Sequence, residues 1–455
     1  MSSPAALPSR ILLIAYEFPP SASPQSLRWT YLSRELHRLG HEVHVLTIDL
    51  GGSSPGLPAL PEGIVVHRTY PGLVRGLVAR RRRYRERKRR PTEGGEHVDG
   101  VVAAPSRGGW KHHISAALQR LAEYVWYPDL RGEWLATARG ELATLLAELT
   151  PDVVISSHEP ATTLQLGLQA KQAGYRWIAD LADPVLAPYT LPRWHDTAAE
   201  LESAVCRQAD GILVTTPAAR QLLLDRHAGA APIVVLTQGF DDTGPPATNI
   251  ADVVEDGMLD LLYTGSFYSF RSAAALLQAV LETPGVRLNI ATIRVPDEVA
   301  AAHRQYPDRI RLLGFLPHLD ALAWQRKADV LVNLANRDPS QVPGKCYEYM
   351  GAGRPILHLG SNPDDAVAVQ IMGHHRGWVC PAEADAIKRL LHQLVQRHAE
   401  GRLEEGLLLS REGVAEFGWS QLARRLDAML GDHARRACST PGNAASLPSR
   451  VDSWP

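Results

Sequence analysis

Lys345 and Glu348 lie one helical turn apart in the segment KCYEYMGAG, which follows the loop PSQVPG. This pattern predicts that Lys345 stands in the first turn of a helix. A lysine there adds its charge to free backbone N–H groups, and together they suit a diphosphate. A carboxylate one turn later can accept hydrogen bonds from two vicinal hydroxyls. The alternative is an exposed ion pair between the two side chains, worth only about 0.2–0.5 kcal/mol.

A second candidate for phosphate binding is the segment TGSFYSFR, residues 264–271. Gly265 and Ser266 end a predicted buried strand, and a short loop leads from them to Arg271. The planar guanidinium of an arginine can hold a phosphate through two parallel hydrogen bonds. An ordinary solvated arginine at a helix start is the alternative, although a cation there opposes the helix dipole.

Polar residues also follow predicted strands in the first half of the chain. His158, in SSHEP, could hydrogen-bond a sugar hydroxyl or help to stabilise a transition state. Asp180 and Asp183 end the next strand, and Asp183 could cap a turn or line an acceptor pocket. The small residues around Ser23 allow close approach to a ligand, and Arg28 could meet a substrate or an interdomain carboxylate.

The composition is that of a globular protein without a specialised charge balance. The chain has 455 residues, 45% of them hydrophobic and 21% charged, with a formal net charge of −1. This length suggests two or three domains, and the charge excludes a global field that would attract nucleic acid or membrane. Any such preference must therefore be local.

The cysteines and the apolar segments suggest a cytoplasmic protein. Four cysteines lie far apart and form no CxxC pair, which argues against a zinc site or a disulfide framework and suits a reducing cytosol. No apolar run approaches the roughly 18–20 residues that a transmembrane helix needs. The segment ILLIAY is too short for a signal-peptide core, and we interpret it as a buried strand.

Strands and helices alternate along the chain, which predicts parallel sheets covered on both faces. Strands are expected within residues 10–20, 41–48, 63–70, 151–160, 176–184, 210–216, 232–239, 259–267, 286–293, 310–316, 328–335 and 355–360. Helices are expected within residues 25–40, 112–126, 132–150, 162–175, 198–209, 217–227, 272–282, 319–327, 345–353, 383–398 and 419–430.

The alternation divides into two doubly wound α/β domains. The turn-rich, acidic segment 241–257 is typical of an interdomain linker. The expected parts of the chain are an N-terminal Rossmann-like domain at 1–245, a basic insertion within it at 75–111, a second Rossmann-like domain at 256–415, a C-terminal helix at 416–432 and a disordered tail at 433–455. Two such domains would face one another across a cleft suited to a two-substrate reaction.

The basic run at residues 80–90 has three interpretations. It could bind an anionic membrane surface, at about 1 kcal/mol for each basic residue close to the lipid. It could also be a solvated, partly helical insertion. Nucleic acid is the weakest interpretation, because Tyr84 is the only aromatic residue that interrupts the run.

The order of these motifs resembles family 4 glycosyltransferases with the GT-B fold. The resemblance is carried by EFPPSASPQSLRWTYLSRELHRLGHEVHVLT, YPDLRGEWLATA, PDVVISSHEP followed by WIADLADP, LLYTGSFYSFRSAAALLQAV and VPGKCYEYMGAGRPIL. Each motif alone is weak, but their order and spacing are fairly specific over about residues 10–430.

The resemblance implies a role for each candidate residue. Lys345 and Arg271 would face the donor diphosphate and Glu348 the ribose, while His158 would lie near the donor sugar. Gly265 and Ser266 would form the phosphate loop. Backbone groups of Phe315 and Leu316 would hold the nucleobase. Ser23, Arg28 and Asp183 would lie on the acceptor side. We take His158, Arg271 and Lys345 as the catalytic candidates.

One position departs from the family signature, which has two glutamates eight positions apart. Glu348 matches the second, but Ser340 stands at the first, so a carboxylate beside the reacting sugar is missing. Several subgroups share this departure, so inactivity does not follow. It does raise the chance of a relative that binds donor without transferring it.

We therefore expect a retaining, metal-independent transfer from a nucleotide-sugar donor to a carbohydrate, lipid-linked or small-molecule acceptor, with no cofactor. Polysaccharide or glycoconjugate assembly is favoured, in the cytoplasm or peripherally on the inner face of the membrane. A soluble natural-product acceptor and a non-catalytic binding protein are the alternatives. A nicotinamide-dependent oxidoreductase is disfavoured, because GxGxxG follows neither domain's first strand.

Overall fold

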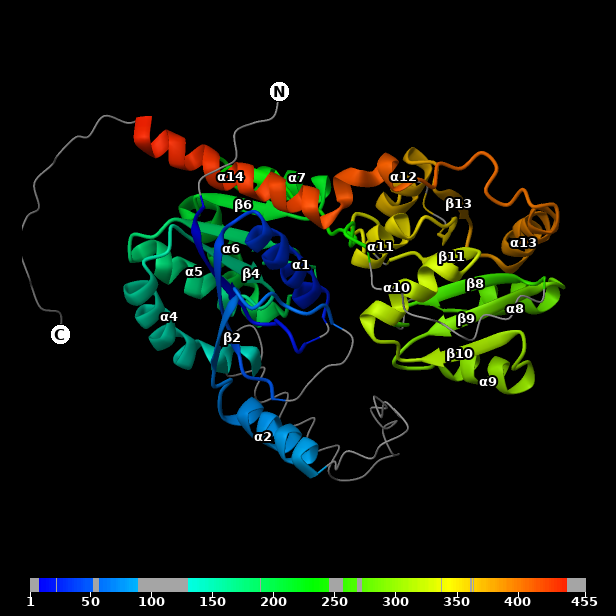
Figure 1. The fold of residues 1–455 in the computed structure, drawn as a ribbon, viewed down its shortest axis with the longest axis horizontal. Helices are drawn as coiled ribbons and strands as arrows, with labels where there is room; N and C mark the ends of the chain where they lie inside the picture. Colours follow the sequence, from blue (N-terminus) through cyan, green and yellow to red (C-terminus); the bar gives the residue numbers. More distant parts are fainter. Residues whose placement is uncertain are drawn as a thin grey trace, which may run out of the picture.

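The computed structural model describes residues 8–21, 23–51, 57–88, 130–188, 190–244, 257–267, 272–336, 338–360, 362 and 364–439. Within them two sheets, each with helices between its strands, confirm the expected α/β architecture of two doubly wound domains (Figure 1). None of the described helices is long and apolar enough to cross a membrane. No group of three or more metal-ligating side chains gathers among these residues.

The N-terminal domain is built on a seven-stranded parallel sheet in the order β3-β2-β1-β4-β5-β6-β7. Its strands are β1 (Arg10–Ala15), β2 (Glu42–Ile48), β3 (Val65–Thr69), β4 (Val153–His158), β5 (Trp177–Leu181), β6 (Gly211–Val214) and β7 (Ile233–Val235). Its helices are α1 (Pro24–Arg38), α2 (Leu73–Lys88), α4 (Leu135–Leu149), α5 (Thr162–Gln172), α6 (His195–Gln208) and α7 (Pro217–Arg226), with short 3₁₀ turns at Leu130–Trp134 and Pro192–Trp194.

The C-terminal domain is built on a six-stranded parallel sheet in the order β10-β9-β8-β11-β12-β13. Its strands are β8 (Leu259–Thr264), β9 (Val286–Ala291), β10 (Ile310–Gly314), β11 (Val330–Leu334), β12 (Ile356–Leu359) and β13 (Gly377–Cys380). Its helices are α8 (Ala274–Glu282), α9 (Asp297–Gln305), α10 (His318–Lys327), α11 (Gly344–Ala352), α12 (Ala366–Gly373) and α13 (Ala384–Ala399).

The central strands are buried on both faces, which explains their continuous apolar runs. In β1, for example, neighbouring residues alternate between two separate cores: Ile11 and Leu13 lie in one, Leu12 and Ile14 in the other. The edge strand β3 is partly exposed. In both sheets the strand order reverses at the first strand, between β1 and β4 and between β8 and β11. In open sheets of this type, ligands bind at the carboxyl ends of the strands beside that reversal.

The last helix, α14 (Trp419–Ser439), follows a 3₁₀ segment at Arg411–Phe417 and returns to the N-terminal domain. Figure 1 shows it lying across that domain, and it packs against α1. Trp419, Leu422, Leu426 and Leu430 are members of the N-terminal core. The helix runs past residue 432 to Ser439, so residues 433–439 are helical and not part of a disordered tail as expected. Residues 440–455 lie outside the described residues.

The expected basic insertion at 75–111 begins as helix. Its first part belongs to α2, which starts two residues earlier at Leu73 and ends at Lys88. The remainder of the insertion, the helix expected at 112–126 and the linker between residues 245 and 256 lie outside the described residues.

Candidate functional site

The candidate residues come from the carboxyl ends of both sheets. In the N-terminal domain, His158 is the last residue of β4 and Asp183 follows β5. In the C-terminal domain, Gly265 follows β8, and the N-terminal turns of α11 carry Lys345 and Glu348. The two groups meet where Gln341 Nε2, just before α11, donates a hydrogen bond of 3.2 Å to Asp183 Oδ1 across the domain interface.

Lys345 is turned toward the end of β8. Its Nζ lies 3.4 Å from the carbonyl oxygen of Thr264 and 4.4 Å from the centre of the Tyr263 ring. Gly265 has a φ of +130°, and a Cβ at that position would lie 3.5 Å from Nζ. The ammonium group therefore lies directly beside the loop that the sequence predicted to bind phosphate.

Glu348 has different contacts, on α10. Its Oε2 accepts a hydrogen bond of 3.3 Å from Gln325 Nε2, and its Oε1 lies 3.9 Å from His318 Nδ1. The Glu348 side chain is 20% exposed. Lys345 and Glu348 thus contact different groups and do not pair with each other. The two side chains are therefore not the exposed ion pair that the sequence left open.

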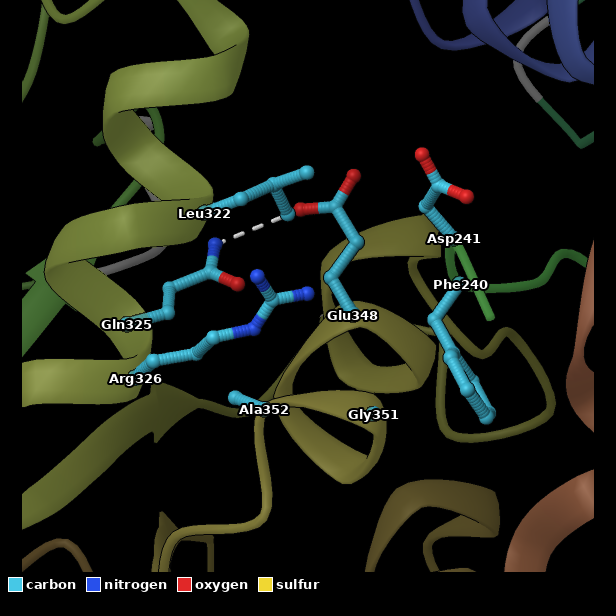
Figure 2. A pocket seen from close by; sticks show the side chains of 8 residues that line it. All are labelled: Phe240, Asp241, Leu322, Gln325, Arg326, Glu348, Gly351 and Ala352. Atoms are coloured by element: carbon cyan, nitrogen blue, oxygen red, sulfur yellow. Dashed lines mark hydrogen bonds between the residues drawn. The ribbon is translucent and has the colours of Figure 1, made fainter. Parts of the chain in front are cut away.

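A small cavity of about 10 Å³ adjoins Glu348, with room for about one water molecule. It is lined by Phe240, Asp241, Leu322, Gln325, Arg326, Glu348, Gly351 and Ala352. Figure 2 shows the Arg326 side chain extending into the space beside Gln325 and Glu348. Sequence reasoning did not single out Arg326, because its position in a regular helix carries no motif.

Burial shapes the chemistry of Arg326. Burial, reinforced by the positive charge of Arg411, lowers the pKa of Arg326 to about 10. Its Nε has no hydrogen-bond partner among the described residues. An under-partnered cation beside Glu348 adds positive potential to the side of α11 that would receive the donor.

His158 is held in one tautomer by the backbone. Its Nδ1 lies 3.0 Å from the carbonyl oxygen of Asp183, and a carbonyl only accepts, so Nδ1 carries the proton. Burial lowers the pKa of His158, which favours the neutral ring. Nε2 is then a hydrogen-bond acceptor, suited to a sugar hydroxyl. Gln25 Nε2 fixes the backbone here through a 2.6 Å bond to the carbonyl oxygen of His158.

Asp183 lies among other acids. Burial, with added repulsion from Glu159 and Asp338, raises the pKa of Asp183 to about 6. Asp338 also accepts hydrogen bonds from Ser340, at 2.9 Å from its backbone nitrogen and 2.6 Å from its hydroxyl. Ser340, which stands where the family signature would have a carboxylate, is thus bonded to the exposed carboxylate of Asp338 two residues earlier.

The structure corrects the expectation that Arg28 lies on the acceptor side. Its side chain is 0% exposed, and its guanidinium bonds both oxygens of Asp180 at 3.2 and 3.0 Å. Two more hydrogen bonds reach the carbonyl oxygens of Leu236 and Thr237. Arg28 therefore joins α1 to β5 and to the chain after β7, and cannot contact an acceptor. Asp180, as the partner of Arg28 in this ion pair, is equally buried and unavailable to a substrate.

The other expected residues are placed as follows. Ser23 caps α1, its hydroxyl accepting from Ser26 N at 3.1 Å. The carbonyl of Ser266 accepts a 2.9 Å bond from the Tyr263 hydroxyl. Phe315 and Leu316 lie half-buried in the loop between β10 and α10, and their contact with a base stays a prediction. Arg271 lies outside the described residues.

Tyr31 links this site to the N-terminal domain. Its hydroxyl lies 3.0 Å from Nε2 of His318, and its ring stacks on Trp419 at 5.7 Å between centres. Burial, together with the charges of Asp241 and Glu348, raises the pKa of Tyr31, so the hydroxyl keeps its proton. Tyr31, His318 and Glu348 thus form a row that crosses from one domain to the other.

Comparison with known proteins gives the same fold. Residues 25–239 match the family described as glycosyl transferase 4-like domain. None of the curated proteins matches the sequence. Sucrose-phosphate synthase of Thermosynechococcus elongatus is similar at a TM-score of 0.61 and 16% identity, with 95% of this chain and 100% of that chain covered.

Two further solved structures are similar over nearly the whole chain. HepE of Anabaena, in complex with UDP-glucose, has a TM-score of 0.56 and 13% identity, covering 93% of this chain and 100% of that one. A trehalose-6-phosphate synthase has a TM-score of 0.59 and 13% identity, covering 93% and 99%. At these identities the likeness shows the fold alone. Residues 25–239, just under half of the chain, thus resemble the glycosyl transferase 4-like domain family, and the chain has the same two-domain α/β fold as these solved structures.

Proposed function

We propose that this protein transfers a sugar, with retention of anomeric configuration, from a nucleotide-sugar donor to a carbohydrate acceptor. The observation that carries the proposal is the separation of tasks on α11. Lys345 lies against the loop after β8, while Glu348 is held one turn later by Gln325. A diphosphate at the first position and a ribose at the second match two neighbouring parts of one nucleotide sugar.

The donor diphosphate would lie against the first turn of α11, where Lys345 and the backbone N–H groups neutralise charge as it leaves. The sugar would extend toward the N-terminal domain, where His158 Nε2 can accept from one of its hydroxyls. In a retaining displacement the acceptor oxygen bonds to the anomeric carbon on the face from which the diphosphate departs. The acceptor proton passes to the leaving phosphate oxygen, so no side-chain base is required.

The similar solved structures guide the choice of donor and stereochemistry. HepE is in complex with UDP-glucose, and the trehalose-6-phosphate synthase is described as an enzyme of glycosyl transfer with retention. A UDP-sugar is therefore the first donor to test. Because Lys345 and the helix N-terminus supply the positive charge that leaving-group departure needs, we expect chelators to leave the rate unchanged.

The acceptor class that we favour is a lipid-linked or polymeric carbohydrate, in polysaccharide or glycoconjugate assembly. The basic run at residues 80–90 supports it, because an anionic membrane surface would bring the enzyme to such an acceptor. A soluble natural product is the alternative acceptor, and transfer to small acceptors in the absence of vesicles would favour it.

The test compares Lys345→Ala and Glu348→Ala with the native chain. We expect Lys345→Ala to lower kcat/KM by roughly 100-fold or more, and Glu348→Ala to act mainly through donor affinity. Lys388→Ala is the matched control, since this exposed lysine pairs with Glu282 far from α11. Unchanged transfer in both site variants would refute the assignment of the site.

A donor screen by thermal shift separates an enzyme from a binding relative. A nucleotide sugar that binds the folded state raises the melting temperature by mass action. Stabilisation without hydrolysis or transfer, across sugar and oligosaccharide acceptors, would identify a binding protein. NMR of the anomeric proton in the first product decides between retention and inversion.

A further inference from the structure

The helix α2 leaves the end of β3 and is fixed to the domain at its start. The backbone N–H groups of Val74 and Arg75 donate to the two oxygens of Glu133, at 3.0 and 2.9 Å. The guanidinium of Arg75 lies 5.5 Å from the centre of the Tyr16 ring. These contacts satisfy the first turn of the helix and set its direction.

A second set of contacts fixes the rotation of α2 about its axis. Ala79 is buried, and its carbonyl lies so close to Gly51 that a Cβ on that glycine would be 2.6 Å away. Arg83 pairs with Asp49 at 2.6 Å. The side of α2 that faces the protein is therefore the one that carries Gly76, Ala79 and Arg83.

The opposite side of α2 is apolar and exposed. Leu73 is 77% exposed and Leu77 64%, and the remaining exposed apolar residues of the helix are Val74, Val78 and Tyr84. At about 100° per residue these five positions occupy one arc of roughly 140°, turned away from Ala79. A helix in a water-soluble domain normally turns such a stripe toward the core. Over its first turns, from Leu73 to Val78, this outward face is apolar, which indicates a binding surface.

Arginines surround this face. Arg80 and Arg82 flank the arc, Arg81 lies within it, and all three are exposed. Apolar side chains bordered by arginines fit a surface that is anionic outside and hydrocarbon beneath. Nucleic acid would use the arginines but would leave Leu73 and Leu77 in water. Long arginine stems can also lie along the apolar boundary while their charges reach the headgroups.

The position of α2 relates it to the candidate site. It begins after β3, at the carboxyl edge of the sheet that also carries His158. Figure 1 shows α2 projecting from that edge, beyond the body of the N-terminal domain. A surface bound by α2 would therefore adjoin the sheet edge that carries His158 and Asp183, the residue expected on the acceptor side.

We infer that α2 is an interfacial helix, whose outward face, residues 73–84, inserts Leu73 and Leu77 into an anionic lipid membrane while Arg80 and Arg82 bind the headgroups. This extends the basic-run interpretation from charge attraction to insertion of an apolar face. The inference rests on the proposed function only for the statement that the acceptor is bound at the membrane surface. Its test measures vesicle binding and does not depend on sugar transfer.

The experiment is co-sedimentation of the full chain with vesicles of phosphatidylcholine alone or with phosphatidylglycerol added. We expect the native chain to sediment with the anionic vesicles only. Leu73→Gln with Leu77→Gln should lower the partition coefficient about tenfold or more, because both side chains lose their apolar burial. Arg80→Gln with Arg82→Gln should lower it about fivefold for each charge removed.

Val369→Gln with Met372→Gln is the matched control, because these residues are also exposed apolar side chains on a helix, α12, of the other domain. It should sediment as the native chain does. Circular dichroism and donor-induced thermal shift check that the α2 variants fold and keep their donor site.

Several outcomes would overturn the inference. They are absence of native sedimentation with anionic vesicles, equal sedimentation of the leucine variant and the native chain, and binding of RNA or DNA that persists in the leucine variant and displaces vesicles. A failure of transfer in every variant, with vesicle binding as expected, would instead count against the proposed reaction.

Discussion

At the scale of single residues, burial decides which polar groups remain available to a ligand. Arg28 and Arg326 are both arginines on helices near the domain interface. The first is enclosed by Asp180 and two carbonyl oxygens, while the second lies beside Glu348 with an under-partnered Nε. Residue type and spacing alone made Arg28 the better candidate. Arg28 is unavailable to a ligand because Asp180, on β5 and far away in sequence, supplies the carboxylate that pairs with it.

The buried pair of Arg28 and Asp180 should be costly to break. Asp180→Asn leaves the arginine charge uncompensated in the core, so we expect the free energy of unfolding to fall by about 3–5 kcal/mol. Urea denaturation followed by tryptophan fluorescence measures it. The double variant Arg28→Met, Asp180→Leu should lose less than the sum of the two single changes. Additive losses would show that the pair is not coupled.

Asp183 gives a prediction about pH. Its pKa is about 6 in the folded state, against an ordinary value of 3.8 for an aspartate in an unfolded chain. The folded state thus binds the proton more tightly, and this group lowers the free energy of unfolding as pH rises from about 4 to 6. Asp183→Asn should therefore stabilise the protein at pH 7.5, on the order of 1 kcal/mol, since the carboxyl is partly exposed.

The advantage of Asp183→Asn should shrink as pH falls toward 5 and the native carboxyl gains its proton. Thermal unfolding of both proteins between pH 5 and 8 tests this. A difference that stays constant over that range, or that grows on acidification, would contradict the raised pKa.

At the scale of elements, the sequence predicts most strands, because a central strand of a covered parallel sheet has a continuous apolar run. It misses β13, whose four residues are too short a run to be singled out. The helix at KCYEYMGAG is also found, since α11 covers Gly344–Ala352 and Gly353, with a φ of +73°, ends it. The packing of that helix could not be predicted. Gly351 leaves space for the ring of Phe240, a contact between residues more than a hundred positions apart.

That contact supports a prediction for α11. A Cβ at Gly351 would lie 2.2 Å from Cγ of Phe240, so Gly351→Ala should displace the ring and destabilise the protein by about 1–3 kcal/mol. Gly373→Ala, on α12, meets no atom within 4 Å and is the control; it should be neutral or stabilising by up to about 1 kcal/mol. Equal melting temperatures for both variants would refute the packing argument.

At the scale of the whole molecule, the two domains carry site residues that face each other, so their relative orientation must be fixed. Tyr31 contributes through its bond to His318, and Gln341 through its bond to Asp183. Neither contact could be anticipated, because each depends on how the domains are oriented rather than on either domain's own pattern. The two-domain architecture itself was predictable from the alternation of strands and helices.

Tyr31→Phe tests whether this register serves donor binding. Loss of one hydrogen bond, about 1 kcal/mol, should shift the domains away from the bound arrangement and raise the donor Kd roughly fivefold. Tyr175→Phe is the control, because it removes a hydroxyl that bonds the carbonyl of Leu146 within one domain. Isothermal titration with the identified donor measures both. A similar rise in Kd for the two variants would leave no role for the interdomain bond.

The return of α14 to the N-terminal domain has a consequence for synthesis of the chain. Trp419, Leu422, Leu426 and Leu430 complete the core around β1, which is among the first segments to leave the ribosome. That core cannot be closed until almost the whole polypeptide has emerged. The N-terminal domain would therefore remain partly folded while the C-terminal domain folds. During translation, the domain that is synthesised first is the last to complete its core.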